Sequence, residues 1–321
     1  MTLPLLVIIG ALNQSLHTGG RVAVSLTAVS LQASPAVIGT IGALYGLLSM
    51  LLSVSVGKLN DRIGPRPPLY AGTLLFIVGG LLPSYHPQLA SLYIAAALIG
   101  LANMVFQVSI QNAVGRLGQR EDRTRNFSTL AIGMSAGAIV GPLVAGYAID
   151  YSGHESAFIF LTLLPFGSLI LLSAVRLDLP APPKQAREGE RPRTSDLLRD
   201  RGLVAIYVIT GIHVLSWELF SFLMPVHLSE IGLSPSMIGI IVGAFSAASF
   251  TMRAILPPLA KRFDHWQMIK GMLMLAGTMF AVIPFANHTL LLVLLAAIIG
   301  GCLGAAQPLT MTLIHDTTPP A

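Results

Sequence analysis

The sequence contains 321 residues, of which 54% are apolar and only 10% are charged, and its formal net charge is +5. The charged residues lie between long apolar segments and do not alternate with apolar residues along amphipathic elements. This composition excludes a water-soluble globular protein and predicts a polytopic membrane protein, and the single cysteine, Cys302, excludes an intrachain disulfide.

Ten apolar segments are long enough to cross a membrane. A helix that spans a bilayer needs about 20 mostly apolar residues. The segments cover residues 3–30, 36–57, 68–85, 89–114, 127–150, 156–175, 202–229, 235–257, 266–286 and 289–314. The first segment is too long and too polar for a cleaved signal peptide, so we expect it to remain as the first helix.

Lysine and arginine occur in alternate connections between these segments. The connections near residues 31–35, 84–88, 151–155, 229–234 and 287–288 contain neither residue. Because positive residues are retained on the cytoplasmic side of membranes, we expect these connections to lie outside and both chain ends to lie in the cytoplasm. The net charge then reflects membrane topology and does not indicate binding to nucleic acid.

The connection after the second segment combines charges with glycines. It contains Gly57, Asp61, Arg62, Gly64 and Arg66. Residues 57–66 resemble the signature loop of the major facilitator superfamily, which joins the second and third transmembrane helices on the cytoplasmic side. A basic hairpin between any two membrane helices would explain the arginines and glycines, but not Asp61 at this spacing. We expect residues 57–66 to form a tight loop at the membrane surface that takes part in conformational change.

The two halves of the chain repeat at a fixed offset of 200 residues. Ser34, Pro35, Ile38 and Gly39 recur as Ser234, Pro235, Ile238 and Gly239, and Gln107 recurs as Gln307. A repeat in the same orientation is typical of the two halves of a major facilitator protein, which are related by an axis along the membrane normal. The predicted fold is therefore all-α, with two parallel pseudo-repeats.

The repeat also predicts how the chain divides. We expect a six-helix bundle over residues 1–176, a cytoplasmic linker rich in proline and charge over 177–200, and a second bundle over 201–321. The second bundle has four predicted helices, so the counterparts of the fifth and sixth helices are missing. We interpret the chain as a C-terminally shortened member of the family.

The fifth segment contains a glycine motif. Its residues are Gly137, Gly141, Pro142 and Gly146. Glycines four apart allow another helix to approach closely. In this position they are similar to the motif of the antiporter branch of the superfamily, although Ala145 stands where that motif has glycine and Ser128 also departs from it. The resemblance favours an antiporter.

Few ionisable residues lie inside the predicted helices. His17 and Arg21 share one face of the first helix, and Glu218 lies at a similar depth in the seventh. We expect Arg21 and Glu218 to face one central cavity and to couple transport to protons, or alternatively to form a static ion pair. Arg253, near a helix end, is expected to extend to the membrane surface.

The fourth apolar segment contains several polar side chains, and these are all uncharged. Gln107 and its counterpart Gln307 lie in helices that line the central cavity in the family, so we expect both to contact substrate. Neutral amides suit a polar, uncharged substrate surface, or alternatively hold helices together.

Together these features predict a secondary-active transporter of small organic compounds, working as a proton-linked exporter. The alternatives are a proton symporter that imports a carboxylate through Arg21, or a non-transporting remnant or sensor. We expect no enzymatic activity and no catalytic residue, cofactor, metal site or nucleic-acid partner. The expected partners are a small-molecule substrate, protons and lipid, for a monomer in a prokaryotic inner membrane.

Overall fold

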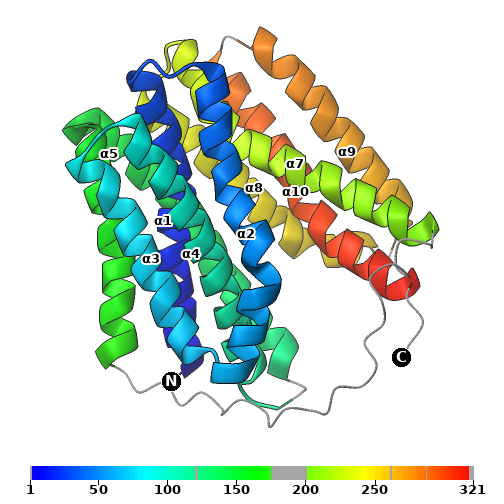
Figure 1. Ribbon diagram of the computed structural model, residues 1–321. Helices are drawn as coiled ribbons and strands as arrows, with labels where there is room; N and C mark the ends of the chain where they lie inside the picture. Colours follow the sequence, from blue (N-terminus) through cyan, green and yellow to red (C-terminus); the bar gives the residue numbers. More distant parts are fainter. Residues whose placement is uncertain (1, 120–121, 175–200, 261, 287, 318–321) are drawn as a thin grey trace. The chain divides into compact units, whose positions relative to one another are not determined.

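A computed structural model describes residues 2–119, 122–174, 201–260, 262–286 and 288–317. Every regular element in these ranges is a helix (Figure 1). The helices are α1 (Thr2–Ser30), α2 (Pro35–Ile63), α3 (Arg66–Tyr85), α4 (Leu89–Gly115), α5 (Arg123–Ala174), α7 (Arg201–Glu230), α8 (Pro235–Ala260), α9 (His265–Val282), the short 3₁₀ helix η2 (Ile283–Phe285) and α10 (Thr289–Thr317). The predicted all-α fold class is confirmed.

Eight of the described helices are long and apolar enough to cross a membrane. The first helix, α1, has 29 residues and is long enough to cross a membrane, but it contains more polar residues and is not one of these eight. The long helix α5 has a non-helical residue, Gly153 (φ 85°, ψ 171°), which divides it into two legs. These legs match the predicted segments 127–150 and 156–175, so the described helices follow the predicted segments in order.

One prediction about the connection at residues 57–66 is wrong. The helix α2 continues to Ile63, and only Gly64 and Pro65 separate it from α3. Gly64 ends α2 with φ 83°, and its N–H donates to the Asn60 carbonyl at 2.9 Å. Charged residues mark where a helix leaves the apolar layer, whereas the helix itself ends where glycine supplies a left-handed conformation. Most of the predicted loop is therefore the last two turns of α2.

The described chain forms two compact units. The first contains Met1–Gln185 and Ser221–Gly243, and the second contains Ala186–Phe220 and Ala244–Ala321. The predicted linker, residues 177–200, lies outside the described residues, and the predicted division into bundles 1–176 and 201–321 stays a prediction.

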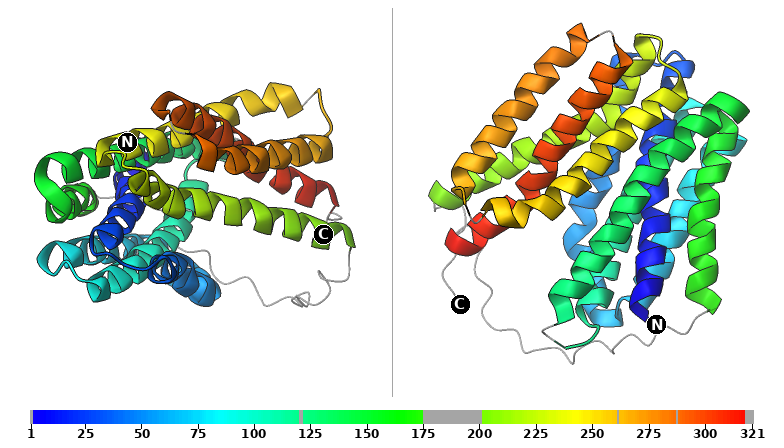
Figure 2. Two further views of the ribbon diagram at one scale, coloured as in Figure 1. Left: turned by 90° about the horizontal axis from the view of Figure 1, so that it is seen from above. Right: turned by 180° about the vertical axis from the view of Figure 1, so that it is seen from behind.

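In the first unit, α1 lies between the legs of α5 (Figure 2). Glycines of α5 bring the two backbones together. A Cβ atom on Gly133 would lie 2.9 Å from the Val7 carbonyl oxygen, and one on Gly141 would lie still closer to the Ser15 carbonyl. Only glycine fits at these contacts.

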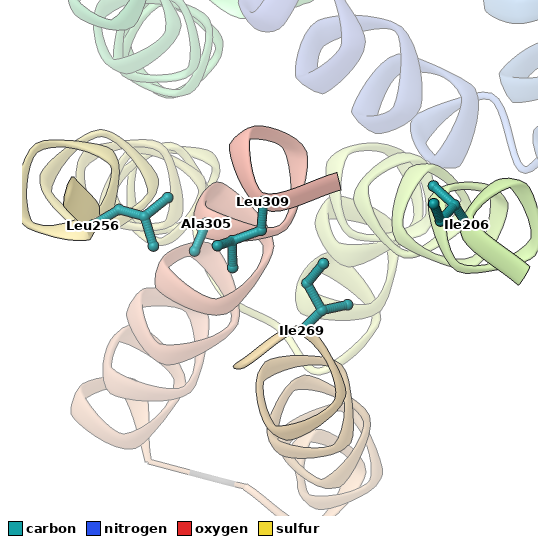
Figure 3. Close-up of a cluster of buried hydrophobic side chains, with 5 residues drawn as sticks. All are labelled: Ile206, Leu256, Ile269, Ala305 and Leu309. Carbon is teal, nitrogen blue, oxygen red and sulfur yellow. The ribbon is translucent and has the colours of Figure 1, made fainter. Parts of the chain in front are cut away.

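The second unit has a small apolar core. Ile206 of α7, Leu256 of α8, Ile269 of α9, and Ala305 and Leu309 of α10 are buried together (Figure 3). Each of its four long helices thus contributes to one cluster, as expected for a bundle whose helices pack through apolar side chains.

The 200-residue repeat has a structural counterpart inside each unit. In the first unit, Gly100 of α4 lies against the backbone of Tyr45 in α2. In the second unit, Gly300 of α10 lies against the backbone of Phe245 in α8. The second pair stands 200 residues after the first, which is the offset that the sequence predicts. The repeated glycines therefore make the same close helix contact twice.

Replacing Gly100 or Gly300 by alanine should destabilise the protein, because the added methyl group would meet backbone atoms that cannot move aside. We expect each change to cost about 1–3 kcal/mol, as overpacking a core does, and to lower the unfolding midpoint in detergent. Gly46→Ala is the control, since nothing lies within 4 Å of the position of its Cβ. Equal stability of the three variants would contradict these contacts.

Candidate functional site

The residues of the signature motif lie at the junction of α2 and α3. Asp61, Arg62 and Arg66 are exposed, Gly57 is half-buried and Gly64 is buried. Asn60, which lies within the motif but is not one of its signature positions, is fully buried, and its side-chain amide has no hydrogen-bond partner within the described residues. The charged part of the motif is therefore available for contacts outside its own helices.

The antiporter-like glycine motif is divided between two neighbours. Gly137 and Gly141 pack against the backbone of α1, at Ala11 and Ser15. Gly146, further along α5, instead lies against the backbone of Pro235 at the start of α8. The first half of the motif packs α5 against α1, and the second half packs α5 against α8.

His17 and Arg21 are buried among aromatic rings. Their exposed fractions are 9% and 7%. The Arg21 guanidinium carbon lies 5.0 Å from the centre of the Tyr45 ring, and the His17 ring makes edge contacts with Tyr45 (6.3 Å between centroids) and Phe76 (6.5 Å). The negative face of an aromatic ring stabilises a cation that has left water. The predicted pair thus shares Tyr45 as a neighbour.

Glu218 of α7 belongs to the second unit, whereas Arg21 belongs to the first. Its predicted pairing with Arg21 therefore stays a prediction. Gln307 lies in α10, and its side chain is outside the described part of the structure.

The second unit has an aromatic cluster of its own. Trp217 of α7, the repeat counterpart of His17, packs edge-on against Phe245, the counterpart of Tyr45, with centroids 4.9 Å apart. Arg253 of α8 lies over Trp217 (6.0 Å) and its Nε donates to the Gly304 carbonyl at 3.2 Å. These contacts bind part of the guanidinium within its own unit, and its extension to the membrane surface stays a prediction.

Three glutamines form a ladder across α1 and α4. The Gln107 amide donates to the side-chain oxygen of Gln14 at 3.5 Å, and the Gln111 amide donates to that of Gln107 at 3.4 Å. Gln14 and Gln107 are half-buried and Gln111 is exposed. The predicted residue Gln107 is therefore the middle of a wider amide surface. The sequence did not predict that Gln14 belongs to this surface, because its contact with Gln107 depends on the packing of two helices that are far apart in sequence.

His154 connects the turn between the legs of α5 to the end of α1. Its Nδ1 atom lies 3.0 Å from the Thr27 hydroxyl. Burial lowers the pKa of the His154 imidazole below its usual value. Burial thus favours the neutral form of the ring at this contact.

Comparison with known proteins identifies the family. Residues 5–321 match the family model of the Major Facilitator Superfamily. The chain belongs to the Major Facilitator Superfamily. This membership confirms the resemblance inferred from residues 57–66 and the fold inferred from the repeat, and it makes the chain a multi-pass integral membrane protein of a transporter family.

The chain is also similar to individual superfamily members. It is 29% identical over 255 residues to the multidrug resistance protein MdtH of Yersinia enterocolitica, a match that covers 75% of this chain and 61% of the relative. MdtH of Yersinia pestis is 28% identical over 256 residues, covering 77% of this chain and 61% of the relative. The matches thus span about three-fifths of the length of these relatives.

Two solved structures share the superfamily fold. A bacterial homologue of the human lysosomal transporter Spinster, in an inward-facing and unoccupied conformation, superposes with a TM-score of 0.74 at 12% identity, covering 98% of this chain and 78% of the other. The nucleoside transporter NupG gives a TM-score of 0.80 at 14% identity, covering 100% and 84%. At these identities the likeness shows the fold alone.

The stability of the protein should depend on His154 at mildly acidic pH. Because the pKa of His154 is lower in the folded than in the unfolded chain, its contribution to stability is present above about pH 6.5 and is lost as the pH falls from there toward the lowered value. The unfolding midpoint should therefore fall between about pH 7.5 and pH 5.5, and His154→Gln should reduce that fall. His86→Gln, at an exposed position, is the control; an equal pH effect in both variants would contradict this account.

Proposed function

We propose that the protein is a secondary-active transporter that exports small, polar organic compounds in exchange for protons. Membership of the Major Facilitator Superfamily supports transport, and the similarity to proteins named for multidrug resistance supports export. The observation that carries the proposal is the ladder of Gln14, Gln107 and Gln111.

The ladder suits a substrate with uncharged hydrogen-bonding groups. Each carboxamide has two N–H donors and an oxygen with two lone pairs, so the bonds within the ladder use a small part of its capacity. These bonds are 3.4 and 3.5 Å long, near the limit for a hydrogen bond. The amides can therefore turn toward a bound amide, carbonyl or hydroxyl at little cost.

The proton pathway would use Glu218, Arg21 and His17. In this proposal Glu218 binds a proton from outside and releases it inside, and the positive charge of Arg21 favours release when the two groups approach. His17 lies one helical turn from Arg21 and can exchange the proton. Gln307 would extend the amide surface from the second repeat.

The charged connections support an orientation with both chain ends in the cytoplasm of a prokaryotic cell, in its inner membrane. In that orientation, the motif formed by Gly57, Asp61, Arg62, Gly64 and Arg66 faces the cytoplasm. We propose that it acts in conformational change, and that the protein works as a monomer with bundles 1–176 and 201–321 as its moving halves.

A second candidate function is import of a carboxylate with protons, with Arg21 as the anion-binding group. The observation that favours it is the burial of the positively charged Arg21 guanidinium, because a guanidinium binds a carboxylate by charge-assisted hydrogen bonds.

Removing one amide of the ladder should weaken substrate binding. In proteoliposomes with an imposed pH gradient, Gln107→Leu should raise the KM for chloramphenicol, an uncharged probe with amide and hydroxyl groups, by about fivefold, the usual effect of one lost hydrogen bond. Gln267→Leu, at an exposed position of α9, is the control. An unchanged KM in Gln107→Leu would remove the ladder from the substrate site.

Replacing Glu218 by glutamine should separate exchange from proton coupling. We expect Glu218→Gln to exchange labelled for unlabelled chloramphenicol across the membrane and to lose accumulation driven by a pH gradient. The variant cannot release a proton but keeps the shape of the side chain. Accumulation with an unchanged pH dependence would show that Glu218 has no part in coupling.

A further inference from the structure

The start of α8 packs against the end of the first leg of α5, within the first compact unit. A Cβ atom on Gly239 would lie 2.5 Å from the Pro142 carbonyl oxygen, and one on Gly146 would lie still closer to the Pro235 carbonyl. The two backbones are therefore in contact over more than one helical turn, and Asp150 lies one turn beyond Gly146.

Asp150 accepts a hydrogen bond from the N-terminus of α8. Its Oδ2 atom lies 2.8 Å from the backbone nitrogen of Ser236, which is 86 residues away in sequence. This length is typical of a bond to an ionised acceptor. The first N–H groups of a helix have no partner inside the helix and attract negative charge.

The other N–H groups at this helix start are accounted for locally. Pro235 has no N–H, the N–H of Met237 donates to the Ser234 hydroxyl at 3.4 Å, and that of Ile238 donates to the Ser234 carbonyl at 3.0 Å. In this first turn, the Ser236 N–H thus differs from the others in donating to a residue that is distant in sequence.

The repeat provides an internal comparison. The helix α2 starts with the same cap, since the Val37 N–H donates to the Ser34 hydroxyl at 3.4 Å and the Ile38 N–H to the Ser34 carbonyl at 3.0 Å. At Ala36, the counterpart of Ser236, no carboxylate among the described residues takes the place of Asp150. Because α2 forms without it, the Asp150 contact is not needed to start such a helix. Its effect is to join α8 to α5.

We propose that Asp150 is a latch residue: its carboxylate holds the start of α8 against α5, and the transport cycle must release it. The carboxylate is exposed, so water can replace the Ser236 N–H as its partner and the contact can break without burying a charge. The inference rests on the proposed transport function, because a latch acts only in a protein whose halves separate. The latch lies beside the connections at residues 151–155 and 229–234, which contain no lysine or arginine.

The test measures distance and not transport, so its outcome is independent of whether a substrate has been found. Nitroxide labels at Tyr85→Cys and Ile231→Cys, with Cys302→Ser, report the separation between the end of α3 and the α7–α8 turn by pulsed electron paramagnetic resonance. Asp150→Ala should raise the ratio of long to short distances about threefold or more, and Asp150→Asn, which keeps an oxygen acceptor but no charge, should give a smaller rise.

Asp264→Ala is the matched control, because Asp264 caps its own helix by accepting the Gln267 N–H at 3.0 Å. It should leave the distance distribution unchanged. A distribution for Asp150→Ala that equals that of the parent, or an equal change in Asp264→Ala, would overturn the proposal. If Asp150→Ala does not fold, the isosteric Asp150→Asn decides in the same way.

Discussion

The close approach of helix backbones at glycine is the constraint on which the structure of this protein depends. In a bilayer, apolar side chains gain little by leaving lipid for protein, so helices associate through tight packing and hydrogen bonds. Gly133, Gly137 and Gly141 supply such packing between α5 and α1. Gly100 and Gly300 supply it within each repeat. These contacts fix the helices, and the helices in turn fix the polar side chains that face one another.

The polar side chains follow two different rules once the helices are packed. Cations lie against aromatic rings, as buried Arg21 does against Tyr45 and half-buried Arg253 does against Trp217. Neutral amides are gathered on a half-buried strip, where Gln107 bonds both its neighbours weakly. The first rule keeps a charge inside the membrane at a tolerable cost, and the second leaves hydrogen-bonding capacity for a ligand. The proposed division between proton coupling and substrate binding corresponds to these two kinds of site.

The fold could be predicted from sequence because the bilayer imposes segment length and the repeat imposes an offset. The site could be predicted only in part. Gln107 was found by its repeat, but its partner Gln14 lies in another helix, and pairing the two requires the packing of α1 on α4. The end of α2 was missed because charge marks the membrane surface and not the helix end. The contact of Arg253 with the Gly304 carbonyl was not predicted, because no sequence pattern marks a backbone carbonyl as a partner.

The central claim is that movement of a small organic substrate is exchanged for protons. It is tested most directly by trapping a pH-sensitive dye inside proteoliposomes and imposing a chloramphenicol gradient with no initial pH difference. If the protein exchanges substrate for protons, inward movement of chloramphenicol drives protons outward, and the lumen becomes alkaline faster than in protein-free liposomes. A lumen pH that changes no faster than in those liposomes, or that falls as substrate enters, would contradict it.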